Sequence, residues 1–263
     1  MQTTLGPIMN LEGKTAVVTG SSRGIGRATA LALAERGCAV VVNYRQSADE
    51  AKATAQEVSE KGADALCVEA DVADEQACID MIEATVAEFG GVDILVNNAG
   101  TTEFISFDDL DQVTDAAWDR ITQTNVKGPF YCARAAHKYL RAAPGGGEIV
   151  NIASIAGFTG NGSSIPYCVS KAGLINLTKC LARSMAPEVR VNAVAPGFIA
   201  NSWMQNGLGP NYEPAKKVAE SRALLNRVCE PSDVADAVLG VLAGSDLVTG
   251  HTVVCDGGWM LGL

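Results

Sequence analysis

The chain has 263 residues, of which 48% are hydrophobic and 19% are charged, and its formal net charge is −10. This length allows either one large α/β domain with a well-buried core or two small domains. The acidic balance argues against a nucleic-acid partner. Charged residues interrupt every apolar run before it is long enough to cross a bilayer. Residues 1–10 lack the basic and apolar regions of a signal peptide, so we expect a short extension on a cytoplasmic protein.

The cysteine pattern argues against disulfides and against a metal site. The eight cysteines stand singly in apolar segments, and no Cys-x-x-Cys pair occurs. Only His137 and His251 are available as imidazole ligands, so we expect no zinc or other metal. We interpret the cysteines as small buried residues of a protein in a reducing compartment.

Short apolar runs alternate with amphipathic segments along the chain. Strands are predicted at 14–18, 38–43, 65–69, 92–96, 148–153, 190–195 and 252–255, and helices at 27–36, 47–61, 74–89, 114–141, 167–185 and 232–243. Strict alternation predicts a parallel sheet with helices on both faces, the doubly wound Rossmann-type α/β class. No linker or change in composition divides the series, so residues 11–263 are predicted to form one domain.

One irregular stretch interrupts the alternation at residues 197–226, which include Trp203, Met204, three glycines and two prolines. A loop of this length in a compact domain is usually either disordered or functional. Because it follows a strand end, where open parallel sheets bind ligands, we interpret it as a lid over a substrate.

A glycine cluster follows the first strand and opens the first helix. Its spacing from Gly20 to Gly26 is G-x-x-x-G-x-G, and a plain glycine turn is the alternative interpretation. In this context glycines let the backbone approach a pyrophosphate at a helix N-terminus. The second strand ends in Asn43-Tyr44-Arg45, without the acidic residue that usually binds the ribose of NAD. Arg23 and Arg45 are either surface arginines or partners of a 2′-phosphate, and together they favour NADP over NAD.

Four further sequence features are each weak evidence of function when taken alone. Tyr167 and Lys171 are four residues apart and share a helix face, and Ser154 follows a strand. Asn125 lies inside a predicted helix, where an Asn indicates either a helix irregularity or a catalytic role. The segment 97–100, Asn-Asn-Ala-Gly, either lines a ribose or stabilises the sheet, and Pro196-Gly197 opens the predicted lid.

In this order, these motifs resemble the short-chain dehydrogenase/reductase family. The set is T-G-x-x-x-G-x-G at 19–26, Asp71-Val72, N-N-A-G at 97–100, Asn125, Ser154, Y-x-x-x-K at 167–171 and P-G at 196–197. It extends from about residue 11 to the C-terminus, and its ordered conjunction is specific although each motif is weak. The resemblance includes 3-oxoacyl-carrier-protein reductase-like members.

The resemblance implies an oxidoreductase that moves a hydride between a nicotinamide and a ketone or secondary alcohol. Tyr167 is then the general acid or base, and Ser154 binds the substrate oxygen. Lys171 holds the nicotinamide ribose and lowers the pKa of the phenol, and Asn125 holds a water. The implied cofactor-binding residues are Gly20, Ser22, Arg23, Gly24, Ile25, Gly26, Asn43, Tyr44, Arg45, Asp71, Val72, Asn98, Ala99, Gly100, Tyr167, Lys171, Pro196, Gly197 and Ile199.

The chain departs from the family after Pro196-Gly197. Members often carry a Thr there that contacts the cofactor, and this sequence has Ala200-Asn201-Ser202, of which Asn201 or Ser202 is the candidate substitute. The expected pocket walls contain no obvious carboxylate-binding arginine; they are residues 101–105, Phe158, residues 163–166, Trp203 and Met204.

Several substrates and roles stay open. A 3-oxoacyl-carrier-protein reductase would use Arg134, Lys138 and Arg141 as a basic patch, but Pro187-Glu188 and the acidic net charge oppose an acidic carrier. An NAD-dependent sugar or polyol dehydrogenase and a non-catalytic dinucleotide-binding regulator are further alternatives. The family is usually tetrameric, and we expect a homotetramer, or a dimer, built on residues 133–136, 182–186 and 259–261.

Overall fold

The computed structural model describes residues 10–262, so the predicted extension lies outside the described residues except for Asn10. Seven strands form one parallel sheet in the order β3-β2-β1-β4-β5-β6-β7. The strands are β1 Thr15–Val18, β2 Ala39–Tyr44, β3 Ala65–Glu69, β4 Ile94–Asn97, β5 Gly147–Ile152, β6 Val189–Pro196 and β7 Thr252–Cys255. The predicted doubly wound α/β fold is confirmed.

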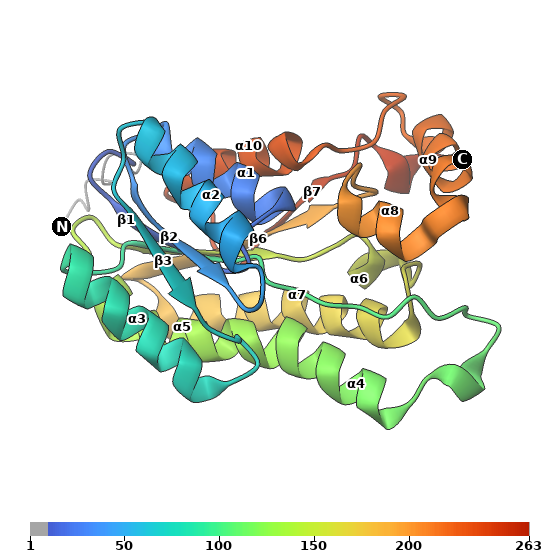
Figure 1. Cartoon of the computed structure of the whole chain (residues 1–263), viewed down its shortest axis with the longest axis horizontal. Coiled ribbons are helices and arrows are strands. Elements are labelled where there is room, and N and C mark those ends of the chain that lie inside the picture. The colour runs from blue at the N-terminus through green and yellow to red at the C-terminus, as the bar shows by residue number, and fades with distance from the viewer. Residues whose placement is uncertain (1–9, 263) are drawn as a thin grey trace.

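Helices cover both faces of the sheet (Figure 1). They are α1 Gly24–Ala34, α2 Ala48–Glu60, α3 Glu75–Phe89, α4 Asp115–Thr122, α5 Gly128–Ala142, α6 Ala156–Thr159, α7 Ile165–Met185, α8 Ser202–Leu208, α9 Tyr212–Arg222 and α10 Pro231–Leu242. Short 3₁₀ turns occur at Leu110–Gln112, Gly209–Asn211 and Trp259–Leu261.

The two cores follow from the alternation of side chains along each strand. Val18 of β1 faces the core under α1, α2 and α10, whereas its neighbour Val17 faces the core over α3, α5 and α7. Both residues are fully buried. Because the central strands are covered on both sides, their sequences are mostly apolar rather than alternating, and the polar residues Glu148, Asn151 and Asn192 of β5 and β6 are buried as well.

The structure divides the predicted helix at 114–141. A π-helical turn, Gln123–Lys127, separates α4 from α5, and it contains Asn125. The prediction of an irregular segment at 197–226 was also wrong in part, because α8 and α9 lie within it. Asn201 caps α8 by accepting a hydrogen bond from the backbone N–H of Met204 at 3.0 Å, a helix-start signal that the surrounding glycines and prolines obscured.

Two expectations about small residues need correction. Ala133, Ala136 and Ala182 are buried against the sheet of their own chain, so these alanines do not form an open face for a neighbouring subunit. The cysteines are not uniformly buried either, since Cys180 is exposed on α7. Within residues 10–262, no cluster of His, Cys, Asp and Glu side chains is arranged to hold a metal ion. None of the described helices is both long and apolar enough to span a membrane.

Candidate active site

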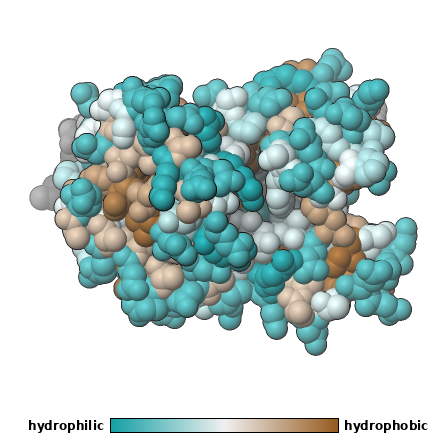
Figure 2. Space-filling model, in the orientation of Figure 1, coloured by the Kyte–Doolittle hydropathy of each residue, from teal (hydrophilic) through white to brown (hydrophobic). Residues whose placement is uncertain are grey.

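A cleft of about 1330 Å³ lies at the carboxyl ends of the strands. Residues that follow all seven strands line it, from Gly20 after β1 to Trp259 after β7. Figure 2 shows that the protein surface on this side is mostly hydrophilic, with smaller hydrophobic areas. All of the predicted catalytic and cofactor-binding residues line the cleft except Gly26 and Asn125, which lie directly behind it. This position is where open α/β sheets bind their ligands.

The glycine loop leaves no room for larger residues. A Cβ atom on Gly26 would lie 2.4 Å from Asn98 Nδ2 and 2.5 Å from the Gly20 carbonyl oxygen. Gly20 has a φ of +61°, and a Cβ there would lie 2.9 Å from Ala99 Cα. The glycines therefore bring the turn, the start of α1 and the segment after β4 into direct contact.

Hydrogen bonds fix this contact. Asn98 Nδ2 donates to the carbonyl oxygens of Thr19 and Gly20 at 2.8 and 3.0 Å. The Thr19 hydroxyl accepts from the backbone N–H groups of Asn98 and Ala99, both at 3.0 Å. Asn98 thus positions the loop in addition to lining the cleft, and its contact with a ribose remains a prediction.

The start of α1 is suited to an anion. No side chain caps it, and its first turn contains no acidic residue. Its N-terminal backbone N–H groups and the positive end of the helix dipole therefore face the cleft without a protein anion. These features and the missing Cβ atoms fit a dinucleotide pyrophosphate.

At the end of β2, Asn43 and Arg45 have different roles, although the sequence analysis treated them together. Asn43 is buried, and its side chain accepts from the Gly20 N–H at 3.0 Å and donates to the Ala70 carbonyl at 3.1 Å. Its amide therefore supports the glycine loop from behind. Arg45 is exposed and lies 3.5 Å from the Asp71 carboxylate, and Arg23 is exposed on the loop.

Ser154, Tyr167 and Lys171 converge on one wall of the cleft. Ser164 caps α7 by accepting from the Tyr167 N–H at 3.4 Å, which sets where the helix begins. Lys171, one turn further on, is buried, and its Nζ lies 5.7 Å from the centroid of the Tyr167 ring. The same Nζ donates to the carbonyl oxygen of Ile152, the last residue of β5, at 2.7 Å.

Burial is the main cause of the pKa shifts of Tyr167 and Lys171. It raises the pKa of Tyr167 to about 12, although hydrogen bonding to Ser154 acts in the opposite direction. Burial also lowers the pKa of Lys171 to about 8. The pKa of the phenol is therefore raised in this structure and not lowered as expected, because desolvation of the phenol outweighs its hydrogen bond to Ser154.

Asn125 is fully buried, and its side chain is bonded within the protein. Its Oδ1 accepts from the Thr101 N–H at 2.8 Å, and its Nδ2 donates to the Thr101 carbonyl at 2.9 Å and to Ser170 Oγ at 3.0 Å. Ser170 Oγ in turn donates to the Tyr167 carbonyl at 2.7 Å. The π-helical turn thus directs Asn125 to connect the segment after β4 with α7, and the predicted water remains a prediction.

The substrate side of the cleft is more aromatic than expected. Trp203 on α8 lies between Tyr167 and Phe104, with ring centroids 6.3 and 6.1 Å apart. Six of the predicted wall residues do not line the cleft: Thr102, Glu103, Phe158, Ser164, Ile165 and Pro166. Ser164 is the N-cap of α7, and Ile165 and Pro166 form the first turn of that helix, which explains why these three side chains are directed elsewhere.

Sequence analysis missed several residues that line this side, and two of them contact each other. Arg222, the last residue of α9, and Trp259, after β7, both line the cleft. The Arg222 guanidinium lies 4.6 Å from the centroid of the Trp259 ring. The two are 37 positions apart in a stretch without a recognisable motif, so only the fold reveals that they meet.

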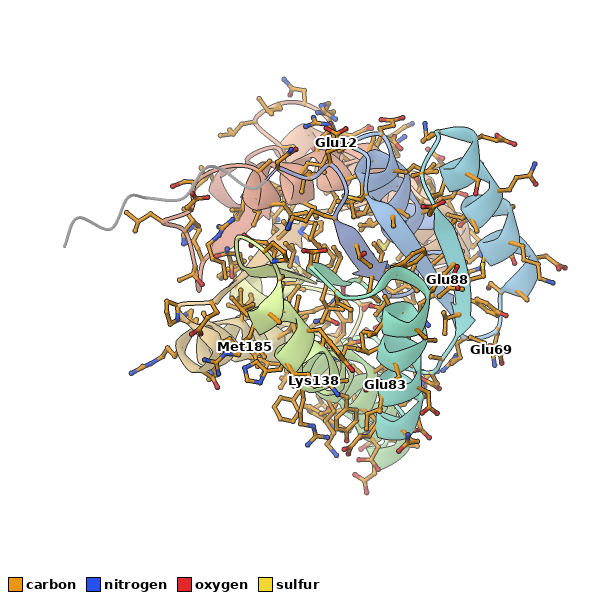
Figure 3. The ribbon with its side chains drawn as sticks, turned by 90° about the vertical axis from the view of Figure 1, so that its left-hand side faces the viewer. Glu12, Glu69, Glu83, Glu88, Lys138 and Met185 are labelled. Carbon is orange, nitrogen blue, oxygen red and sulfur yellow. The ribbon has the colours of Figure 1, made fainter. Side chains whose placement is uncertain are left out.

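The expected basic patch on α5 is neutralised. Arg134, Lys138 and Arg141 form ion pairs with Glu75, Glu83 and Glu188, respectively. Figure 3 shows Lys138 and Glu83 beside each other on neighbouring helices. The patch therefore presents little excess positive charge to an acidic carrier.

Comparisons with known proteins agree with this geometry. A family model described as enoyl-(acyl carrier protein) reductase matches residues 20–260. A putative ketoacyl reductase 2 of granaticin polyketide synthase from Streptomyces violaceoruber is 41% identical over 94% of this chain and 96% of its own length. The 3-oxoacyl-[acyl-carrier-protein] reductase FabG of Staphylococcus epidermidis is 40% identical over 93% of this chain and 98% of its own length.

Solved structures show the same relationship. A putative short-chain alcohol dehydrogenase from Sinorhizobium meliloti superposes with a TM-score of 0.89 at 36% identity, covering 98% of this chain and 100% of that one. A putative short-chain dehydrogenase/reductase from Burkholderia xenovorans gives 0.88 at 32% identity, covering 95% and 98%. The chain, with its glycine loop and its Ser154, Tyr167 and Lys171 in one cleft, belongs to the short-chain dehydrogenase/reductase family of oxidoreductases.

Proposed function

We propose that this oxidoreductase interconverts a ketone and a secondary alcohol with NADP(H), and that Tyr167 transfers the proton. The observation that carries the proposal is the convergence of Ser154, Tyr167 and Lys171 beside the glycine loop in one cleft. A bound nicotinamide dinucleotide would supply or accept the hydride.

The other roles in the reaction would belong to residues of the protein. With a pKa of about 12, Tyr167 is protonated at neutral pH and is ready to donate a proton to a ketone oxygen. Ser154 would stabilise the negative charge that develops on this oxygen. Lys171 is within reach of the ring and would hold the nicotinamide ribose, and Asn125 would keep α7 and the segment after β4 in place.

The preference for NADP rests on charge near the end of β2. Asn43 stands where an acidic residue would repel a 2′-phosphate, and Arg23 and Arg45 are exposed beside it. Arg45 is held only loosely by Asp71, at 3.5 Å between exposed side chains, so a phosphate can compete for it. Asn201 would replace the family Thr as a cofactor contact, because its Nδ2 would lie only 3.8 Å from a Cβ on Gly24 of the glycine loop.

Residues 197–226 would act as the substrate lid. Helix α8 has no buried residue and contributes Trp203 above Tyr167. One contact depends on Gly207, where any Cβ would overlap the Phe104 ring. Because α8 has no buried residue, this part of the lid can open and close at low free-energy cost, whereas Tyr212 and Ala219 of α9 are buried and anchor the rest.

A 3-oxoacyl thioester is the second candidate substrate. The names of the relatives favour it, since two of them are ketoacyl or 3-oxoacyl-carrier-protein reductases. The ion pairs of Arg134, Lys138 and Arg141 oppose docking of an acidic carrier on α5. Reduction of a thioester delivered without a carrier is compatible with both observations.

Titration with NADPH and NADH, followed by fluorescence, tests the cofactor. We expect NADPH to bind more tightly, and Arg23→Ala combined with Arg45→Ala to reduce the preference by roughly 10- to 100-fold. Arg36→Ala is the matched control, because Arg36 is exposed and lies outside the cleft lining. Equal binding of the two cofactors would favour the NAD-dependent sugar or polyol dehydrogenase alternative.

A panel of ketones and 3-oxoacyl thioesters with the preferred cofactor tests the reaction. Turnover that depends on Tyr167 supports the proposal. Cofactor binding without turnover of any compound in the panel would favour the non-catalytic regulator.

A further inference from the structure

The cleft carries more positive than negative charge, although the protein as a whole is acidic. Among residues 10–262, its lining includes four cationic side chains, Arg23, Arg45, Lys171 and Arg222, and two carboxylates, Asp71 and Asp108. The formal net charge of the chain is −10. A locally positive cleft in an acidic protein indicates selection for anionic ligands at that place.

The cations lie at different ends of the cleft. Arg23 follows β1 and Arg45 follows β2, in the half of the sheet where the glycine loop lies. Trp259, which stacks with Arg222, follows β7 at the opposite edge. Ser154 follows β5, two strands from β7, which corresponds to roughly 10 Å at ~4.8 Å between neighbouring strands. Arg222 therefore lies too far across the sheet to serve the same phosphates as Arg23 and Arg45.

The Arg222 guanidinium is oriented, and no carboxylate of residues 10–262 neutralises it. It stacks at 4.6 Å over Trp259. The nearest acid on its own helix by sequence, Glu220, pairs with Lys216 instead. Ala219 and Ala223 on either side are buried, so the backbone that carries Arg222 is anchored. A planar guanidinium held in this way suits two-point recognition of a carboxylate.

A structural role is the alternative. Arg222 is in the last turn of α9, where a cation stabilises the helix dipole. That role requires neither stacking on a residue from another element nor exposure to the cleft, and Arg222 has both.

We propose that Arg222 is a substrate-binding residue and that the physiological substrate is a ketone carrying a carboxylate several bonds from the carbonyl. This inference rests on the proposed ketone reduction and adds a specificity determinant to it. It replaces the sequence-based expectation of a pocket without a carboxylate-binding arginine.

The test uses three methyl ketones of increasing length, 4-oxopentanoate, 6-oxoheptanoate and 8-oxononanoate, each paired with its methyl ester. We expect one of the acids to be reduced with a kcat/KM at least roughly 10-fold above that of its ester, mainly through a lower KM. The length of the preferred acid then reports the distance between Tyr167 and Arg222.

Two variants test whether Arg222 causes the preference for acids over esters. Arg222→Gln should reduce the acid-to-ester ratio by roughly 10- to 100-fold, and Arg222→Lys should restore part of it. Lys217→Gln is the matched control, because it removes one positive charge from the same helix outside the cleft lining and should leave the ratio unchanged. A purely helix-stabilising Arg222 would instead change the melting temperature without changing the ratio.

The outcomes separate this inference from the proposed function. If acids and esters are reduced equally well and Arg222→Gln leaves their ratio unchanged, the inference is overturned while ketone reduction stands. If only 3-oxoacyl thioesters are reduced, and equally by wild type and Arg222→Gln, the substrate class is also wrong. If no ketone or thioester is reduced, the proposed function itself fails.

Discussion

The two halves of the cleft are built in different ways. In the cofactor half, glycines and Asn98 join three segments through backbone contacts so close that a single added Cβ atom would overlap them. In the substrate half, α8 has no buried residue, and Trp203 is 39% exposed. Backbone contacts hold the cofactor half in place. The substrate half is formed by side chains, some of them on the lightly packed helix α8. Substitutions in the cofactor half should therefore change stability and cofactor affinity, whereas substitutions in the substrate half should change substrate preference.

The largest expected effect is at the boundary between the halves. Tyr167→Phe removes the hydroxyl that would transfer the proton, and we expect kcat to fall by roughly 10²- to 10⁴-fold. The affinity for NADPH should stay within about 2-fold of wild type, because the ring remains in place. Steady-state kinetics and a fluorescence titration measure the two effects. Turnover at the wild-type rate would show that another group supplies the proton.

Gly26→Ala tests the backbone-fixed half. The new Cβ would approach Asn98 Nδ2 and the Gly20 carbonyl oxygen within 2.5 Å, so the loop must move. We expect the free energy of unfolding to fall by about 1–3 kcal/mol and NADPH affinity to fall by roughly 10-fold or more. Gly240→Ala on α10 is the control, since nothing lies within 4 Å of its Cβ position. If Gly26→Ala binds NADPH normally, the close contact is not required for the cofactor half.

Lys171→Met should separate stability from activity. The depression of the Lys171 pKa from 10.5 to about 8 corresponds to a charge-burial penalty of about 3 kcal/mol, offset by about 2 kcal/mol from its bond to the Ile152 carbonyl. We expect the variant to lose most activity and to gain about 1 kcal/mol in unfolding free energy at pH 7.

The pH dependence gives an independent check on Lys171. In the wild type, the folded protein binds fewer protons than the unfolded chain between about pH 8 and pH 10.5, so this group makes stability rise with pH in that window. Below pH 8 the lysine is protonated in both states and contributes no slope. Urea denaturation at pH 7 and pH 9.5 should show the rise in wild type and a smaller one in Lys171→Met. Identical slopes would indicate that the lysine is not desolvated.

The smallest effect is expected in the substrate half of the cleft. Trp203→Ala removes a ring that packs on Tyr167 and Phe104 but is partly exposed. We expect KM to change by less than about 10-fold, in a direction that depends on substrate size, with kcat nearly unchanged. A loss of stability above about 1 kcal/mol would show that α8 belongs to the rigid part of the fold.

The difference between the halves also explains what the sequence could predict. The strands and the glycine loop were predictable because continuous apolar runs and glycines at fixed spacing have few structural alternatives. Ser164, Ile165 and Pro166 were wrongly placed on the pocket wall, because the orientation of a side chain depends on where its helix begins, and the Ser164 cap sets the start of α7. Arg222 and Trp259 were missed because their contact is long-range. The raised pKa of Tyr167 depends on burial, which a motif does not report.

The π-helical turn at Gln123–Lys127 has a consequence for the evolution of this chain. A wide turn holds one residue more than a regular helix would, so deleting one residue there would restore regular helical hydrogen bonds. Because the wide turn absorbs the extra residue within about the same rotation as a regular turn, the same deletion would leave α5 nearly in phase with α4. Cys132, Ala133, Ala136 and Leu140 would still face the sheet. Loss of the extra residue would therefore change the direction of Asn125 toward Thr101 without repacking the core.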